Sequence, residues 1–126
     1  MSQHLEVLIV EDAAELATIF REILEMNGMK VEVIMDGALA LQHLQSFTPD
    51  LILLDMHLPN VSGQEILDFI RASERLKKVK VIAITANALL AADLDDKADL
   101  TLLKPVTFTQ ISDLSARILA TKNSSD

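Results

Sequence analysis

Hydrophobic residues are spaced in two different ways along this chain, and the two spacings alternate. Short runs of consecutive apolar residues are typical of strands buried on both faces of a sheet. The segments between these runs carry apolar residues at steps of three and four, which predicts amphipathic helices. The predicted strands are Leu5–Val10, Lys30–Met35, Leu51–Leu54, Val79–Ile84 and Leu100–Leu103.

Helix-terminal signals place the ends of the helical segments. The first helix is expected to stop at Asn27 and Gly28, a pair typical of a C-terminal cap, and a second is predicted within Asp36–Ser46. Two further helices begin at capping boxes, S-x-x-E at Ser62 and T-x-x-Q at Thr107. The residues predicted to face the core are Leu16, Ile19, Phe20, Ile23 and Leu24 in the first helix, Ala40, Leu41 and Leu44 in the second, Ile66, Leu67 and Ile70 in the third, and Phe108, Ile111, Leu114 and Ile118 in the last.

Five predicted strands that alternate with helices indicate an α/β fold, a parallel sheet covered by helices on both faces. Right-handed crossovers make such a sheet doubly wound, and for five strands we expect the flavodoxin-like order 2-1-3-4-5. The strand order then reverses between the first and third strands. Ligands of such folds bind beyond the carboxyl ends of the strands near that point, so candidate site residues should follow strands one, three, four and five.

The composition limits the class of protein and its partners. A chain of 126 residues is expected to form one domain, here residues 1–121, with 122–126 as a polar tail or the start of a linker. The net charge of −8 disfavours direct binding to nucleic acid or to an anionic membrane. Cysteine is absent, which excludes disulfides and thiolate sites. With no signal peptide or membrane span visible, we expect a cytoplasmic location.

Polar residues follow four of the five predicted strands. Glu11 and Asp12 come after the first strand, Asp55 after the third, Thr85 after the fourth and Lys104 after the fifth. Three carboxylates in one pocket repel one another, so their convergence makes physical sense around a divalent cation, and Mg²⁺ with its preference for oxygen ligands is the natural candidate. A cation, a lysine and a hydroxyl around one carboxylate suit a transferred phosphoryl group, whose charge spreads over its oxygens.

These residues stand in motifs that resemble those of the receiver domain of two-component response regulators, and the resemblance covers essentially the whole chain. Each motif alone is weak, whereas four of them in order, each at a strand end, are specific. The motifs are the acidic pair Glu11-Asp12, an L-L-D-M-x-L-P-x-x-x-G pattern that contains Asp55 and runs to Gly63, the switch hydroxyl and its small neighbour at Thr85-Ala86, and the lysine with its cis-proline partner at Lys104-Pro105.

The resemblance implies a signalling function and a metal site. Asp55 would take a phosphoryl group from the phosphohistidine of a sensor histidine kinase or a phosphotransfer protein. Asp12, Asp55 and the backbone carbonyl of His57 would ligate Mg²⁺, and Glu11 would act through a metal-bound water. Such a domain catalyses only its own phosphorylation and dephosphorylation, and it controls a downstream protein or an output domain by changing conformation.

The resemblance also implies how the phosphoryl group changes the conformation. Lys104 would pair with Asp55 and then with the phosphoryl group. Thr85 would rotate inward to hydrogen-bond it and so move the loop that begins at Ala86. Pro105 would hold the chain after Lys104 in its cis form.

The chain departs from the family pattern on the face through which receivers usually signal. Thr101 stands where many members carry an aromatic residue that turns inward on activation. The fourth helix, within Ala88–Asp96, is predicted to be short or irregular, because the interval from Thr85 to Lys104 is nearly one helical turn shorter than in most members. This stretch should be acidic and should favour a basic partner, because it holds Asp93, Asp95, Asp96 and Asp99.

Three other protein classes remain alternatives. A Mg²⁺-dependent phosphohydrolase with an aspartyl nucleophile would need a second Asp where this chain has His57. A flavodoxin-like cofactor binder would need a phosphate loop in place of Glu11 and Asp12. A degenerate receiver would keep the fold, lack some of the site residues and act only as a docking module. This chain has all of those site residues.

Single residues also have plainer structural interpretations. Glu11 and Asp12 could cap the first helix, Thr85 could be an ordinary strand residue, and Lys104 could be solvated. His57 is either an exposed loop residue or a residue at the pocket mouth that affects hydrolysis of the phosphoryl group. His4 and His43 are predicted at the surface, and the core is predicted to include Met26, Met29, Met35 and Met56.

Overall fold

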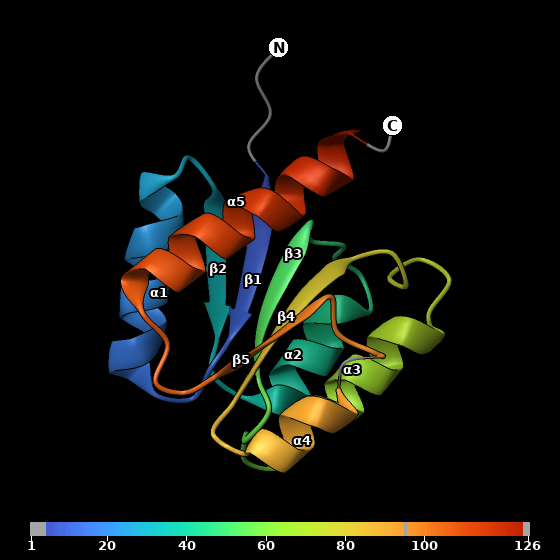
Figure 1. Ribbon diagram of the computed structural model, residues 1–126. Helices are drawn as coiled ribbons and strands as arrows, with labels where there is room; N and C mark the ends of the chain where they lie inside the picture. Colours follow the sequence, from blue (N-terminus) through green and yellow to red (C-terminus); the bar gives the residue numbers. More distant parts are fainter. Residues whose placement is uncertain (1–4, 95, 125–126) are drawn as a thin grey trace.

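The computed structural model describes residues 5–94 and 96–124 of the chain. Within these residues, strands and helices alternate throughout, as Figure 1 shows. The strands are β1 (Glu6–Val10), β2 (Lys30–Ile34), β3 (Leu51–Asp55), β4 (Lys80–Thr85) and β5 (Leu100–Leu103). The helices are α1 (Ala14–Met26), α2 (Gly37–Leu44), α3 (Gly63–Ala72), α4 (Ala88–Asp93) and α5 (Phe108–Ser124).

The strands form one parallel sheet in the order β2-β1-β3-β4-β5, which confirms the predicted fold. Helices α1 and α5 cover one face, and α2, α3 and α4 lie on the other (Figure 1). All five residues of β3 are buried, as expected for a central strand with helices on both sides. Because every strand runs in the same direction, all the carboxyl ends lie along one edge of the sheet.

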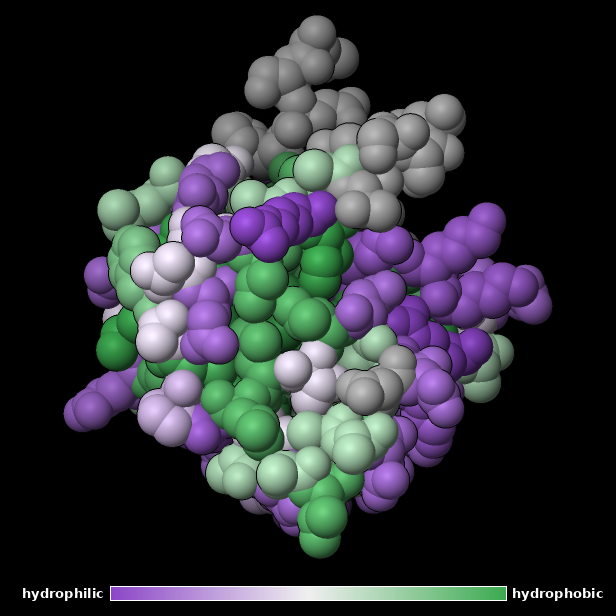
Figure 2. Space-filling model, in the orientation of Figure 1, coloured by the Kyte–Doolittle hydropathy of each residue, from purple (hydrophilic) through white to green (hydrophobic). Residues whose placement is uncertain are grey.

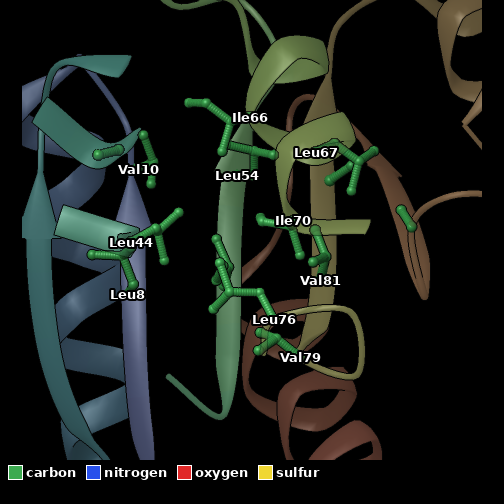
Figure 3. Close-up of a cluster of buried hydrophobic side chains, with 14 of the residues drawn as sticks. Leu8, Val10, Leu44, Leu54, Ile66, Leu67, Ile70, Leu76, Val79 and Val81 are labelled. Carbon is green, nitrogen blue, oxygen red and sulfur yellow. The ribbon is translucent and has the colours of Figure 1, made fainter. Parts of the chain in front are cut away.

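Alternate residues of each strand belong to two separate hydrophobic layers, because successive side chains of a strand point to opposite faces of the sheet. On one face, Leu8 and Leu54 pack against Leu44 of α2 and Ile70 of α3, and Figure 3 shows part of this cluster. The other layer contains the interleaved strand residues and the buried faces of α1 and α5. The core is almost entirely aliphatic, as the composition predicts.

The predicted core is wrong at four positions. Ile19 is 51% exposed because the buried face of α1 runs through Ala17 and Phe20 instead. Phe108 is 56% exposed because it is the first residue of α5 and lies beyond the part of the helix that covers the sheet. Met26 and Met35 are also exposed, whereas Met29 and Met56 are in the core as predicted.

The predicted helix caps are present. Gly28 follows the C-cap of α1 with a φ of +83°, in the left-handed region that glycine adopts without strain. The Ser62 hydroxyl accepts a hydrogen bond from the N–H of Glu65, and Thr107 exchanges reciprocal bonds with Gln110. Helix α5 continues through Ser124, so the start of the predicted polar tail is helical, and the domain boundary at residue 121 stays a prediction.

Helix α4 is short, as predicted, and none of its six residues, all within the described part of the chain, is buried. The charge of the predicted acidic surface around it is partly balanced. Asp99 is exposed, but its carboxylate accepts the N–H of Val81 at 2.7 Å and pairs with Arg71 at 3.0 Å. Asp93 and Asp96 are exposed, and Asp95 lies outside the described residues.

Hydrophobic residues form a band on the face that carries α5, β5 and α4 (Figure 2). Exposed leucines on these elements include Leu89, with 82% of its surface accessible, and Leu103. Along residues 5–94 and 96–124, no helix combines the length and the apolar character that crossing a membrane requires.

Candidate functional site

The sheet register brings the predicted site residues to one edge. Val10 lies beside Leu54, so Glu11 and Asp12 follow β1 next to Asp55 at the end of β3. Thr85 ends β4, beside the end of β5, and Lys104 follows β5 directly. Four segments that are distant in sequence therefore converge, as the strand-end interpretation predicts.

Three carboxylates form the centre of the site. Ligand oxygens of Glu11, Asp12 and Asp55 all lie within 4.8 Å of one another. Glu11 and Asp55 are buried, with 1% and 2% of their surfaces exposed, whereas Asp12 faces solvent. Lys104 supplies the positive charge, with its Nζ 3.5 Å from Asp55 Oδ1 and 3.8 Å from Glu11 Oε1. One lysine among three carboxylates leaves an excess of negative charge that a divalent cation would balance.

Of the two carboxylate oxygens of Glu11, one has a hydrogen-bond partner among the described residues and the other has none. Its Oε2 accepts the N–H of Ala13 at 3.2 Å. Its Oε1 is buried and has no hydrogen-bond partner among the residues that the structure describes. Burial and the neighbouring charge of Asp55 raise the pKa of Glu11 from an ordinary 4.5 to about 7, and burial is the larger cause. A buried acceptor oxygen without a donor fits a metal-binding role.

We expect the metal-free protein to lose stability as the pH rises from about 4.5 to 7. In this range folded Glu11 keeps a proton that the unfolded chain has released, so ionising it in the folded state costs free energy. Urea unfolding in EDTA measures the free energy of unfolding. Relative to the wild type, that of Glu11→Gln should rise across this pH range by at most about 3 kcal/mol. A constant difference between the two proteins from pH 4.5 to 7 would contradict the prediction.

The plainer interpretation of Glu11 and Asp12 as helix caps is not what the structure shows. The N-cap of α1 is Ala13, and no side chain caps that helix terminus within the described residues. The two acids instead face Asp55 across the end of the sheet. Their charge therefore serves the pocket.

Thr85 is fully buried, but its hydroxyl is not directed to Asp55 by any hydrogen bond among the described residues. Its Oγ1 lies 2.8 Å from Nε2 of His57 and accepts the N–H of Asn87 at 3.0 Å. His57 also contacts Asp55, because its backbone N–H donates to Asp55 Oδ1 at 3.1 Å. The side chain of His57 thus contacts the predicted switch hydroxyl of Thr85. Neither of the two sequence interpretations of His57 predicts this contact.

The remaining predicted residues lie around this centre. Pro105 follows Lys104 through a cis peptide bond, and Ala86 is exposed in the loop after β4. Thr101 lies in β5 opposite Ala83 and is half-buried, with a hydroxyl that has no partner among the described residues. No bulky side chain occupies that position of the strand.

Two further residues support the site, and neither of them has a predicted role. Asn87 caps α4, since its Oδ1 accepts the N–H groups of Leu89 and Leu90. An Asn before an apolar run is a recognisable N-cap signal. Gly63 packs on the backbone at the end of β3, and a Cβ built there would lie 2.5 Å from the carbonyl oxygen of Asp55. Its position at the end of the L-L-D-M pattern is the only sequence signal for this contact.

The comparisons with known proteins agree with this geometry. The family model described as the response regulator receiver domain matches residues 7–116. The chain is 39% identical to the polar-differentiation response regulator DivK of Brucella ovis over 83 residues, which are 66% of this chain and 68% of DivK.

Solved structures of receiver domains have the same fold. The signal receiver domain of a Luxo repressor protein from Vibrio parahaemolyticus is 28% identical, with a TM-score of 0.90 over 98% of this chain and 96% of that one. The receiver domain of a sensor histidine kinase from Pseudomonas aeruginosa is 30% identical, with a TM-score of 0.84 over 94% of this chain and 99% of that one. That structure is described with a magnesium ion coordinated in its active-site cleft.

Proposed function

Because this chain belongs to the response regulator receiver domain family of two-component systems, we propose that Asp55 is its phosphoacceptor and that Mg²⁺ is its cofactor. The observation that carries the proposal is the convergence of a buried aspartate with a lysine and two further carboxylates. Asp55 is 2% exposed, and its Oδ1 lies 3.5 Å from the Lys104 ammonium. Among the described residues, Asp55 is the only aspartate that is buried.

The proposed reaction is a phosphoryl transfer from a phosphohistidine. An Asp55 carboxylate oxygen attacks the phosphorus and forms an acyl phosphate, while the bond from phosphorus to the histidine nitrogen breaks and the imidazole leaves. Lys104 supplies positive charge beside the oxygens of the transferred group. The backbone N–H of His57, which donates to Asp55 Oδ1, helps to hold the carboxylate in position. Hydrolysis of the acyl phosphate resets the domain, so its only catalysis is on itself.

The residues present fit a magnesium ion. Glu11, Asp12 and Asp55 offer the hard carboxylate oxygens that Mg²⁺ prefers, and the partnerless Oε1 of Glu11 is buried beside them. We assign direct ligation to Asp12, Asp55 and the His57 carbonyl, and ligation through water to Glu11. When bound, the ion supplies positive charge for the oxygens of the phosphoryl group.

A hydrophobic cavity next to Lys104 is the proposed contact for the phosphohistidine-bearing partner, a sensor histidine kinase or a phosphotransfer protein. It has a volume of about 340 Å³ and is lined by Leu16, Lys104, Pro105 and Val106. Phe108, which is 56% exposed, lies two residues beyond Val106. A partner bound in this cavity would lie close to Asp55, because Lys104 lines the cavity and also pairs with Asp55. A cytoplasmic location would place the domain with such partners.

Incubation with acetyl phosphate and Mg²⁺ tests the proposed function. Intact-mass measurement should show one added phosphoryl group, and peptide mapping should find it on Asp55. Asp55→Asn and EDTA should each abolish the addition, whereas the exposed control Asp93→Asn should not. Phosphorylation that persists in Asp55→Asn or in EDTA would refute the assignment. Steady turnover of a small phosphate ester would instead favour the phosphohydrolase alternative.

We expect Lys104→Ala to bind Mg²⁺ more tightly than the wild type, by about two- to tenfold, because a positive charge has left the pocket. The same change should weaken the conformational response to phosphorylation. Calorimetric titration with Mg²⁺ measures the affinity, and the exposed Lys78→Ala is the control with the same change of net charge. A collapse of Mg²⁺ affinity in Lys104→Ala alone would mean that the lysine maintains the structure of the pocket.

A further inference from the structure

One hydrogen bond connects the exposed loop after β3 to the buried end of β4. The ring nitrogen Nε2 of His57 lies 2.8 Å from the hydroxyl oxygen of Thr85. Thr85 has none of its surface exposed, whereas His57 faces solvent. The imidazole therefore lies over the threonine and binds its hydroxyl from the solvent side.

From this contact we propose that His57 is a latch on Thr85, a positioning residue that holds the switch hydroxyl in its unphosphorylated place and so raises the threshold for switching. The proposal rests on the proposed function, since the hydroxyl has to move only if Asp55 receives a phosphoryl group. His57 suits this role because it touches both partners. Its backbone N–H binds Asp55 Oδ1 at 3.1 Å while its ring binds Thr85.

The bonds of the Thr85 hydroxyl explain why the two states compete. A hydroxyl has one proton and two lone pairs, and one lone pair already accepts the N–H of Asn87 at 3.0 Å. If the hydroxyl donates to His57, its single proton is used, and a phosphoryl group, which only accepts, cannot have it. If His57 donates instead, both lone pairs are filled and the proton points in the one direction that remains.

Movement of the hydroxyl breaks the latch in either tautomer of His57. The side chain of threonine changes χ1 by jumping between separate rotamer wells, so the oxygen cannot approach the end of β3 gradually. A jump moves Oγ1 away from the His57 ring and from the Asn87 N–H together. Thr85 must give up both bonds to reach Asp55, and the bond to His57 adds to that cost.

The first test needs no phosphoryl group. Three-bond couplings to the Thr85 methyl group, measured by NMR, report its χ1 populations. We expect one dominant Thr85 rotamer in the wild type. His57→Leu keeps a similar bulk without a polar atom and should give rotamer averaging. His57→Gln restores a polar group of similar reach and should recover the single rotamer. A single unchanged rotamer in His57→Leu would overturn the latch.

The second test measures the threshold with beryllofluoride, a mimic of the phosphoryl group, in the presence of Mg²⁺. The amide signals of residues 86–90 report switching. His57→Leu should switch at about three- to tenfold lower mimic concentration than the wild type, and His57→Gln should lie near the wild type. In a Thr85→Ala background, His57→Leu should change the midpoint by less than about twofold.

The outcomes separate the latch from the function on which it rests. Equal midpoints for wild type and His57→Leu, or the same shift with and without Thr85, would overturn the latch while leaving the phosphoacceptor role intact. No response of the wild-type protein to the mimic would overturn the phosphoacceptor role and the switching threshold together. If the Thr85 rotamer still averaged in His57→Leu in that case, the hydrogen bond from His57 would hold Thr85 in place without any role in switching.

Discussion

Replacing Arg71 by alanine is expected to lower the free energy of unfolding by about 2–4 kcal/mol. The guanidinium of this α3 residue donates to three backbone carbonyls, of Lys97 at 2.6 Å, Lys77 at 3.0 Å and Val79 at 2.8 Å. It also pairs with Asp99 at 3.0 Å. The variant would leave these acceptors short of a donor in a partly buried place, because the Arg71 side chain is only 24% exposed.

Urea denaturation of two further variants isolates the cause. Arg71→Lys keeps the charge but loses the planar fork of donors, so it should recover less than half of the lost stability. Arg21→Ala removes an arginine that is 46% exposed and forms a 3.8 Å pair with Glu25, and it should cost less than about 1 kcal/mol. Equal losses in Arg71→Ala and Arg21→Ala would show that the four bonds contribute little.

Replacing Gly63 by alanine should destabilise the fold by about 1–3 kcal/mol, although helix propensity alone predicts a gain of about 1 kcal/mol. Gly63 is the first residue of α3 and is buried. An added Cβ would lie 2.5 Å from the Asp55 carbonyl oxygen and 2.6 Å from Cα of Met56. Both are backbone atoms, so the strand end itself would have to shift.

The same shift should reduce phosphorylation of Asp55 by acetyl phosphate, because the carboxylate moves relative to Lys104. The control is Gln64→Ala, one position along the same helix and exposed, which should change neither stability nor phosphorylation appreciably. Thermal unfolding and the rate of mass gain measure the two effects. A Gly63→Ala protein that is more stable than the wild type would show that the backbone accommodates the methyl group freely.

The fold could be predicted from the sequence because its signals are local. Runs such as Leu51–Leu54 are too apolar to lie anywhere but between two helical layers, and the structure buries all of them. Caps at Ser62 and Thr107 involve residues three positions apart, so their spacing is visible in the sequence. The parallel order then follows from connection rules that hold for nearly all such sheets.

The centre of the site could be predicted for a similar reason, since parallel strands bring their ends together whatever their side chains are. Contacts that depend on the reach of one side chain could not. The bond from His57 to Thr85 joins residues 28 positions apart, and the ion pair of Arg71 with Asp99 joins residues 28 apart. No periodicity marks such pairs, so the sequence predicts the exposure of Asp99 but not its ion pair with Arg71.

The errors at Ile19 and Phe108 have a different origin. Helical spacing identifies a stripe about 100° wide but not its edges, and Ile19 lies just outside the stripe that contacts the sheet. Phe108 has the right spacing, but it is the first residue of α5 and is exposed. Spacing cannot tell an apolar residue that packs on the sheet from one that lies past its edge.

Helix α4 is fastened to the core beyond its C-terminus and to the Thr85 hydroxyl at its N-terminus, so it can act as a lever. Beyond its C-terminus, Leu94 is buried and the carbonyl of Lys97 is held by Arg71, whereas at its N-terminus Asn87 is attached to the hydroxyl of Thr85. A helix of six residues is about 9 Å long, so a tilt of about 10° around the C-terminal end moves the N-terminal end by roughly 1.5 Å. The exposed side chain of Leu89 lies near that end, so a rotation of the buried Thr85 hydroxyl would displace an apolar side chain on the surface.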